Sequence, residues 1–191
     1  MFTKSQPPRI PLPKGWQGCV KSAAIYAFSL AHLESRQVEV AGITPHPNEA
    51  WMKQIARNVT MDEWGFLESR RYLIHDRDTK YCESFRDIIE SGDVKTLPLP
   101  ARSPNLNAFA ERWVKSVKEE VLSKLILFGE SSLRRALREY LVHYHVERNH
   151  QGKDNVLLFP TATKAENRVN GLVRCQERLG GLLKYYHQEA A

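Results

Sequence analysis

Apolar and polar positions alternate along the first part of the chain in the way that short strands do. Ala23–Leu33 is an apolar run of strand length. Gln37–Ile43 alternates polar and apolar side chains, as a half-buried strand does. Because only a polar turn, Glu34–Arg36, separates the two runs, they are predicted to form an antiparallel hairpin.

Helical spacing follows the hairpin. Asn48 can cap a helix over Glu49–Asn58, in which Trp51 and Ile55 fall on the side that would face a core. The same reasoning predicts further helices over Ser84–Ser91, about 105–127 and 133–147, a short helix over 60–67, and strands over Arg71–Asp76 and Val94–Leu99. This order predicts an α/β fold, with a mixed sheet and helices on both faces.

Both ends of the chain depart from this pattern. Residues 1–20 carry four prolines and no acid, which predicts an irregular basic lead-in. Residues 161–188 are predicted to be helical in part, with a break at Gly180-Gly181. We therefore expect a core over residues 21–155 and a C-terminal helical extension over 156–191.

The composition is that of a protein able to bury a core, with 42% apolar and 26% charged residues. No apolar run approaches the roughly 20 residues of a membrane span. The first 21 residues lack the apolar stretch of a signal peptide. We expect a cytoplasmic protein with no membrane partner. The net charge of +6 favours a polyanionic partner.

Asp76 stands at the end of a predicted strand. Open α/β sheets bind ligands beyond the carboxyl ends of their strands, so a carboxylate there can face a ligand. The ordinary alternative is an acid that caps the turn over Arg77–Lys80. Asp78 is a rival ligand, but it lies two residues into that turn, so Asp76 is the better candidate.

Glu111 lies in a predicted helix whose start is marked by Ser103 and Pro104. Lys115 and Lys118 follow four and seven residues later, on the same helix face as Glu111. One face thus offers a carboxylate for a metal ion and two ammonium groups for phosphates. The ordinary alternative is a solvated Glu–Lys pair.

Other basic residues form a second row, which could neutralise DNA phosphates or could be a solvated helical face: Arg134, Arg135, Arg138 and Arg148. Two histidines at alternate positions of a helix point in different directions, so no metal site follows from this spacing. We expect the group to be surface or DNA-proximal: His143, His145 and His150.

Three segments together resemble a known family: Tyr72–Asp78, Ser103–Arg112 and Tyr144–Gly152. They are similar to the integrase catalytic core of bacterial insertion-sequence transposases, a group that shares the retroviral-integrase, ribonuclease-H-like fold. The combination is a strand ending in Asp76, 34 intervening residues, and a helical motif ending in Glu111 and Arg112. The resemblance covers roughly residues 23–155.

The resemblance implies an Asp-Asp-Glu site that binds two Mg²⁺ or Mn²⁺ ions and cuts and joins DNA. Asp76 matches the second acid of such a site and Glu111 the third. Arg112, Lys115 and Lys118 are then expected to contact DNA. The expected partners are insertion-sequence ends and target DNA, and self-association into a homo-oligomer is an open alternative.

The first acid of that set is missing. The resemblance places it near Arg9 or Ile10, yet no Asp or Glu occurs before Glu34. Glu34, in a turn, and Glu39, on a later strand, are poor substitutes. We therefore expect an N-terminally truncated copy with impaired strand cleavage and strand transfer. The alternatives are an inactive remnant that binds DNA or a full-length transposase, and a soluble scaffold whose acids coincide by chance.

Overall fold

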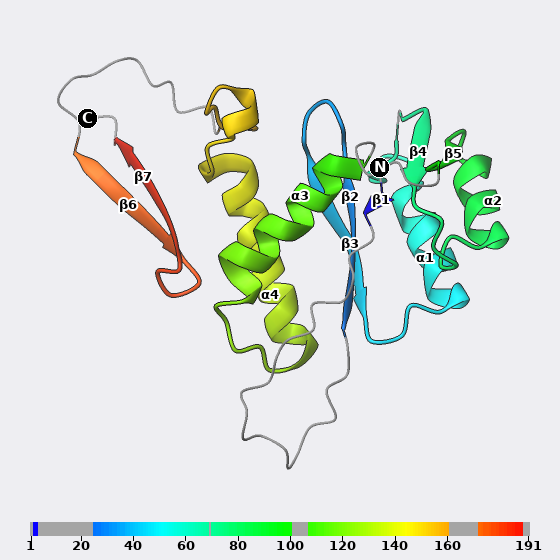
Figure 1. Cartoon of the computed structure of the whole chain (residues 1–191), viewed down its shortest axis with the longest axis horizontal. Helices are drawn as coiled ribbons and strands as arrows, with labels where there is room; N and C mark the ends of the chain where they lie inside the picture. Colours follow the sequence, from blue (N-terminus) through cyan, green and yellow to red (C-terminus); the bar gives the residue numbers. More distant parts are fainter. Residues whose placement is uncertain (1, 4–24, 69, 101–106, 161–171, 189–191) are drawn as a thin grey trace, which may run out of the picture. The chain divides into compact units, whose positions relative to one another are not determined.

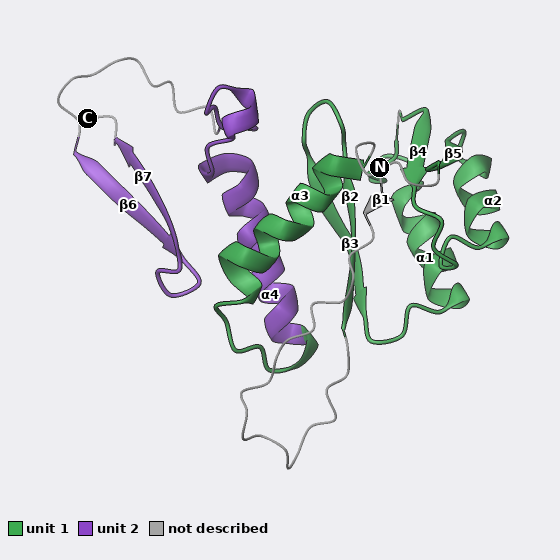
Figure 2. Cartoon of the chain, viewed as in Figure 1, with its two compact units in different colours: residues 1–130 green, residues 131–191 purple. Residues whose placement is uncertain are grey.

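The computed structural model describes residues 2–3, 25–68, 70–100, 107–160 and 172–188 (Figure 1). The chain forms two compact units, residues 1–130 and 131–191, and each is described by itself (Figure 2). In the described residues, the first unit contains two small sheets and three α-helices, and the second contains an α-helix and a hairpin. The domain boundaries that we expected after residues 20 and 155 stay predictions.

The first unit begins with an antiparallel sheet in the order β1-β2-β3: β1 (Phe2–Thr3), β2 (Tyr26–Ala31) and β3 (Val38–Thr44). The β2–β3 pair is the predicted hairpin, closed at Ala31 opposite Val38. A strand at Phe2–Thr3 was not predicted, because the prolines that follow it favour irregular structure. The rest of the predicted lead-in, residues 4–20, lies outside the described residues.

A parallel pair of strands forms the second sheet of this unit. β4 (Tyr72–His75) and β5 (Lys95–Pro98) are joined by α2 (Glu83–Ser91), as parallel strands require a crossover. These elements confirm the predicted strand, helix and strand. β4 also contacts β1, so the two sheets of the unit are neighbours.

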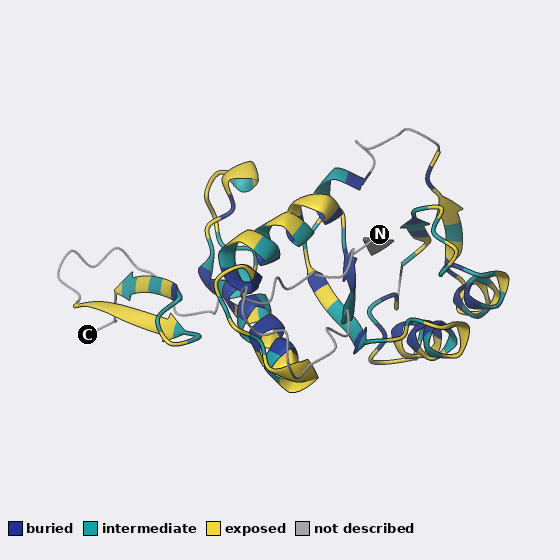
Figure 3. Cartoon of the chain, turned by 60° about the horizontal axis from the view of Figure 1, so that its bottom comes forward, coloured by how far each residue is buried: buried dark blue, intermediate teal, exposed yellow. Residues whose placement is uncertain are grey.

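The core of the first unit lies between the sheets and two helices. α1 (Glu49–Val59) starts where the Asn48 side chain accepts a hydrogen bond of 2.9 Å from the Trp51 amide, as the cap predicts. Figure 3 shows buried residues along one side of α1 and exposed ones along the other. The core consists of buried residues from both sheets, α1, α2 and their connections: Phe28, Leu30, Met52, Ile55, Ala56, Val59, Leu67, Leu73, Tyr81, Phe85, Ile89 and Val94.

A glycine allows α1 to approach β3 closely. A Cβ added to Gly42 would lie 2.6 Å from Ile55 Cδ1 and 2.8 Å from Trp51 Cζ2. The Trp51 ring has little room to retreat, because it meets the ring of Phe28 edge-on at 6.2 Å between centroids. Gly42 therefore sets the distance between helix and strand.

The third helix packs against the other side of the first sheet. α3 (Ala108–Val117) contacts β1 and β2, and it lies across the β2–β3 pair from α1 (Figure 1). It continues as a wide π-helical turn, η2 (Lys118–Leu122). The predicted helix over 105–127 is thus shorter, and residues 105–106 lie outside the described part of the chain. Helices on both faces of this sheet were predicted.

The second unit opens with α4 (Gly129–Val142), which ends in a π-helical turn, η3 (His143–Glu147), and is followed by a 3₁₀ turn, η4 (Gln151–Lys153). The predicted helical extension is wrong for residues 172–188, and residues 161–171 lie outside the described part of the chain. β6 (Val173–Arg178) and β7 (Leu183–Gln188) form an antiparallel hairpin. Leu179, Gly180 and Gly181 have φ values of 52°, 68° and 86°, so the glycine pair turns the hairpin instead of breaking a helix.

The mixed α/β class is confirmed, while the ribonuclease-H-like arrangement stays a prediction. The short helix expected over 60–67 is wrong, because this segment is a series of turns. None of the helices in the described ranges is both long and apolar enough to cross a bilayer.

Candidate functional site

Asp76 directly follows the last residue of β4, and the residues before and after it each form a hydrogen bond with Leu99. The Leu99 amide donates to the His75 carbonyl at 2.8 Å, which extends the β4–β5 ladder past β5. The Arg77 Nε donates to the Leu99 carbonyl at 3.0 Å. Two bonds to the same residue after β5 therefore fix the position from which the Asp76 side chain projects.

The Asp76 side chain is half-buried, and its carboxylate makes little contact with other polar groups. Its Oδ1 accepts one long bond of 3.3 Å from the Asp78 amide, which is the turn contact of the ordinary alternative. Asp78 is more heavily engaged: it accepts from the Lys80 amide at 3.0 Å and forms an ion pair with the Lys80 ammonium at 3.5 Å. Asp76 is thus the less committed of the two possible ligands.

A buried histidine, His75, forms a hydrogen bond with the backbone of Asp76. Sequence reasoning did not single out this residue. His75 is 3% exposed, and its Nδ1 donates to the Asp76 carbonyl at 2.6 Å. Its ring lies 4.6 Å from that of Tyr81. Burial lowers the pKa of His75, so the ring is neutral at pH 7. A histidine inside a buried strand and next to an acid was the available signal.

The pKa of Tyr81 is affected by burial and by the negative charge of the turn after β4. Burial raises the pKa of its hydroxyl well above the usual value, and the carboxylates of Asp76 and Asp78 raise it further. The tyrosine therefore keeps its proton at neutral pH. The turn after β4 places two acids beside an apolar, protonated ring.

Glu111 lies in the first turn of α3 and is exposed. Across the structurally described ranges it makes no hydrogen bond or ion pair. Just before the helix, Asn107 is 6% exposed, and no described residue donates a hydrogen bond to its Oδ1. Asn107 gives no side-chain cap to α3. At the start of α3, two acceptor side chains therefore have no hydrogen-bond partner among the described residues.

The predicted DNA-binding residues lie on α3 and at the start of η2, and they also contact other side chains. The Arg36 guanidinium covers the Phe109 ring at 3.1 Å, and Arg112 lies 5.7 Å from the same ring. Lys115 forms an exposed ion pair of 3.8 Å with Glu119 rather than with Glu111. Lys118 begins η2 and is half-buried. Surface pairs of this kind contribute little stability, so Lys115 remains available to a phosphate.

The fold brings the elements of Asp76 and Glu111 to a common neighbour. β4 and α3 each contact β1 (Figure 1). β1 itself contributes Phe2 and Thr3, and neither is an acid. Among the residues with a described structure, no group of three or more His, Cys, Asp or Glu could hold a metal ion. The three-acid set of a two-metal site is thus not found in the described part of the chain, and a metal ion shared by Asp76 and Glu111 stays a prediction.

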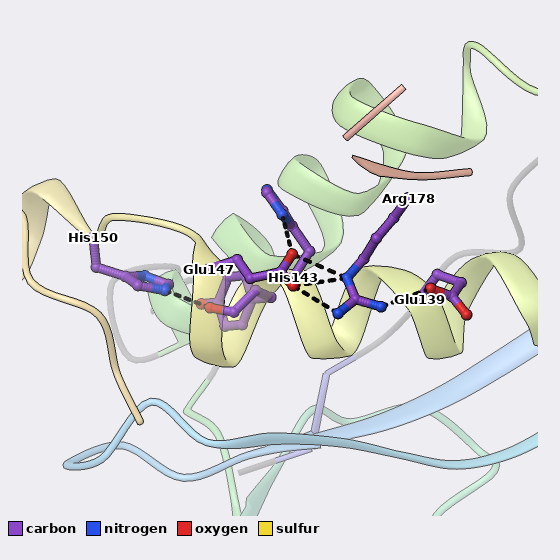
Figure 4. A network of polar contacts seen from close by, with 6 residues as sticks. Glu139, His143, Glu147, His150 and Arg178 are labelled. Carbon is purple, nitrogen blue, oxygen red and sulfur yellow. Dashed lines mark hydrogen bonds and ion pairs between the residues drawn. The ribbon is translucent and has the colours of Figure 1, made fainter. Parts of the chain in front are cut away.

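The second unit contains a different polar cluster, centred on Glu147 (Figure 4). Its carboxylate is 3% exposed and accepts from Arg178 at 2.9, 2.9 and 2.6 Å. Arg178 also binds Glu139 at 2.9 Å, and His143 lies 3.1 Å from Glu147. Burial alone would raise the pKa of Glu147, but the hydrogen bonds from Arg178 and His143 outweigh it and lower that pKa. This cluster joins β6 to the helix and is structural.

The three histidines are therefore not surface groups as a set. His143 and His150 are both 8% exposed. His150 Nε2 donates to the Tyr144 carbonyl at 2.8 Å, and the His145 ring meets the Phe159 ring edge-on at 5.5 Å. Burial, and then the nearby His150, lower the pKa of His145 to about 4. The prediction of surface side chains is wrong for His143 and His150, which are buried, whereas His145 is half-buried. The proximity of the group to DNA stays a prediction.

A scan against protein-family models found no match to this chain, and a search of curated protein sequences found none.

Proposed function

We propose that this chain is an integrase-type DNA-processing core with a ribonuclease-H-like fold, whose strand cleavage and strand transfer are impaired by the absence of one acid. The observation that carries the proposal is that β4 and α3, the elements bearing Asp76 and Glu111, both lie against β1. These two acids occupy the positions that the transposase resemblance assigns to the second and third members of the catalytic set.

Each residue has a role in this proposal. Asp76 and Glu111 would hold a Mg²⁺ or Mn²⁺ ion, which when bound would activate the attacking water or 3′-hydroxyl. Arg112, Lys115 and Lys118 would bind phosphates along α3. His75 would hold the backbone of Asp76 still through its 2.6 Å hydrogen bond. A protein with these roles would work in the cytoplasm, beside chromosomal DNA.

The decisive experiment measures nicking and joining of end-labelled DNA duplexes with Mn²⁺. We expect slow cleavage that Asp76→Asn or Glu111→Gln abolishes. Asp87→Asn, at an exposed position of α2, is the matched control and should leave the rate unchanged. Equal activity in all variants would overturn the assignment of both acids.

A second candidate function is DNA binding without chemistry, as in an inactive transposase remnant. This candidate function is favoured by β1, whose two residues, Phe2 and Thr3, are not acidic. Such a protein would shift labelled DNA with a steep salt dependence and never cut it. A chain that neither binds nor cuts DNA would support the scaffold alternative instead.

A further inference from the structure

The turn that joins β2 to β3, residues 32–37, is held in shape by its own polar groups. The His32 amide donates to the Gln37 carbonyl at 2.8 Å, and the Arg36 amide donates to the His32 carbonyl at 3.0 Å. The Gln37 amide also donates to the Ser35 Oγ at 3.2 Å. Arg36 has a φ of 64°, which places it in the left-handed region. The side chains of this turn therefore project from a fixed backbone.

A histidine of this turn holds an arginine from another part of the chain. His32 Nε2 lies 3.3 Å from Arg70 Nη1, and His32 Nδ1 lies 2.7 Å from the Ser35 Oγ. Burial, and then the charge of Arg70, lower the pKa of His32, so its ring is neutral at pH 7. Because a guanidinium can only donate, Nε2 accepts from Arg70, and Nδ1 carries the proton that it donates to Ser35.

Arg70 is oriented by this neutral partner rather than by an acid. In the part of the chain that is described, neither Glu34, in the same turn, nor Glu68, two residues earlier, forms an ion pair with it. Its Nε is buried, and no described residue accepts a hydrogen bond from it. A guanidinium has five N–H groups in a rigid fork that matches the oxygens of a phosphate. Arg70 therefore keeps both its positive charge and most of its donors for an anion.

The same turn brings a second arginine to α3. The Arg36 guanidinium lies 3.1 Å from the centre of the Phe109 ring, and that of Arg112 lies 5.7 Å from the same centre. Phe109 is in the first turn of α3, so the β2–β3 turn and the start of this helix lie side by side (Figure 1). A contact as close as that of Arg36 uses the face of the guanidinium, and its N–H groups lie at the edge. The arginines of the turn thus continue the basic residues of α3.

We propose that Arg70 and Arg36 bind phosphate groups of a DNA backbone that passes over the β2–β3 turn to the start of α3. This inference rests on the proposed function, and it extends the DNA contact from Arg112 on α3 to a second element of the same unit. His32 is a positioning residue, because it contacts Arg70 and not the phosphate. Contacts with the backbone carry no sequence information, so this site binds DNA of any sequence.

The test is fluorescence anisotropy of the full chain with a labelled DNA duplex at several salt concentrations. Arg70→Ala and Arg36→Ala should each lower the slope of log K against log salt by about 0.9, because each removes one phosphate contact. Arg70→Lys should keep the slope, since it keeps the charge, but should weaken binding several-fold, because an ammonium lacks the fork. His32→Phe should do the same, since Arg70 then loses only the group that orients it.

Inorganic phosphate separates a backbone phosphate from a phosphate ion in solution. At constant ionic strength, it should displace the duplex no more than chloride does. Stronger displacement from the wild type than from Arg70→Ala would assign the site to the phosphate ion and overturn the assignment to DNA.

Arg57→Ala is the matched control, since Arg57 is an exposed arginine of α1, which lies across the β2–β3 pair from α3. It should bind with the wild-type slope. Circular dichroism should show that every variant is folded, and Arg36→Ala with Arg70→Lys decides the matter if Arg70→Ala is not. Wild-type slopes for Arg70→Ala and Arg36→Ala would overturn this inference alone. A wild type that binds no DNA would overturn the proposed function with it, whereas lowered slopes without Mn²⁺-dependent cutting would support this site and contradict only the proposed cleavage.

Discussion

Arg178 donates hydrogen bonds of 2.9, 2.9 and 2.6 Å to the carboxylate of Glu147, which lies 31 residues earlier in the chain. The side chain of Glu147 is 3% exposed and that of Arg178 is 17% exposed. The first and largest cause of the raised pKa of Arg178 is its hydrogen bond to Glu147. One arginine thus fastens the β6–β7 hairpin to the helix of the second unit.

Removal of that arginine is expected to destabilise the second unit strongly. Arg178→Ala leaves the Glu147 carboxylate buried without its main partner, which costs about 3 kcal/mol. Urea unfolding followed by far-UV circular dichroism measures the loss. Lys184→Ala is the control, because the Lys184–Glu177 pair is exposed and should contribute almost nothing to stability. Similar losses in the two variants would show that Glu147 is not held as the structure indicates.

The stability of the second unit is expected to fall as the pH is lowered from about 6.5 to about 4. The pKa of His145 is about 4 in the folded protein against 6.5 when unfolded, so the unfolded chain binds the proton first and stability is lost on acidification. For a half-buried ring the loss is about 1–2 kcal/mol. Unfolding free energies measured across this range should therefore decline.

His145→Phe should flatten that decline while keeping the edge-on contact with Phe159. His46→Phe, at an exposed loop position, should leave it unchanged. The lowered pKa of Glu147 contributes stability that is lost only below about 4.5, so the two groups act in largely separate pH ranges. A decline above pH 5 that persists in His145→Phe would assign the effect to another group.

A methyl group at position 42 is expected to push α1 away from β3. Gly42→Ala should cost about 1–3 kcal/mol, because the added Cβ would lie 2.6 Å from Ile55 Cδ1 and 2.8 Å from Trp51 Cζ2. Thermal unfolding measures the change. The double variant Gly42→Ala/Ile55→Val should recover part of the loss by removing the nearest atom. A neutral Gly42→Ala would mean that the helix shifts freely.

The stack of Arg36 on Phe109 should help to position the start of α3, which carries Glu111. A double-mutant cycle with Arg36→Ala and Phe109→Leu should give a coupling energy of about 1 kcal/mol, as a close cation–π contact does. The same cycle with Arg112→Ala should give less, because that guanidinium lies 5.7 Å from the ring and is exposed. Equal couplings would remove Arg36 from this role.

Local sequence patterns predicted the elements of the first unit well. The hairpin at Tyr26–Thr44 and the cap at Asn48 depend on neighbouring residues, so periodicity and side-chain chemistry identify them. The turn at 60–68 was mistaken for a helix. Its shape depends on Gly65 lying against backbone atoms of Val59 and Met61, a contact that no periodicity encodes.

Long-range contacts account for the other differences. The strands of the C-terminal hairpin carry polar residues on both faces, so alternation gave no strand signal. What holds the hairpin is Arg178 on the distant Glu147. The candidate site shows the same division. The sequence proposes Asp76 and Glu111 as candidates from their settings. The contacts of β1 with both β4 and α3, and the hydrogen bond from His75 to Asp76, are products of the tertiary fold.

DNA affinity should depend on salt in proportion to the cations that contact phosphates on α3. If Arg112, Lys115 and Lys118 each neutralise one phosphate, each Ala variant should lower the slope of log K against log salt by about 0.9. Fluorescence anisotropy with a labelled duplex at several salt concentrations measures this slope. Glu119→Gln should strengthen binding slightly, because it frees Lys115 from its 3.8 Å ion pair. Lys53→Ala, on α1 and paired with Glu49 at 3.0 Å, is the control and should leave the slope unchanged. If the three α3 variants behave as Lys53→Ala does, DNA does not lie along this helix, and the second basic row on α4 becomes the next surface to test by the same measurement.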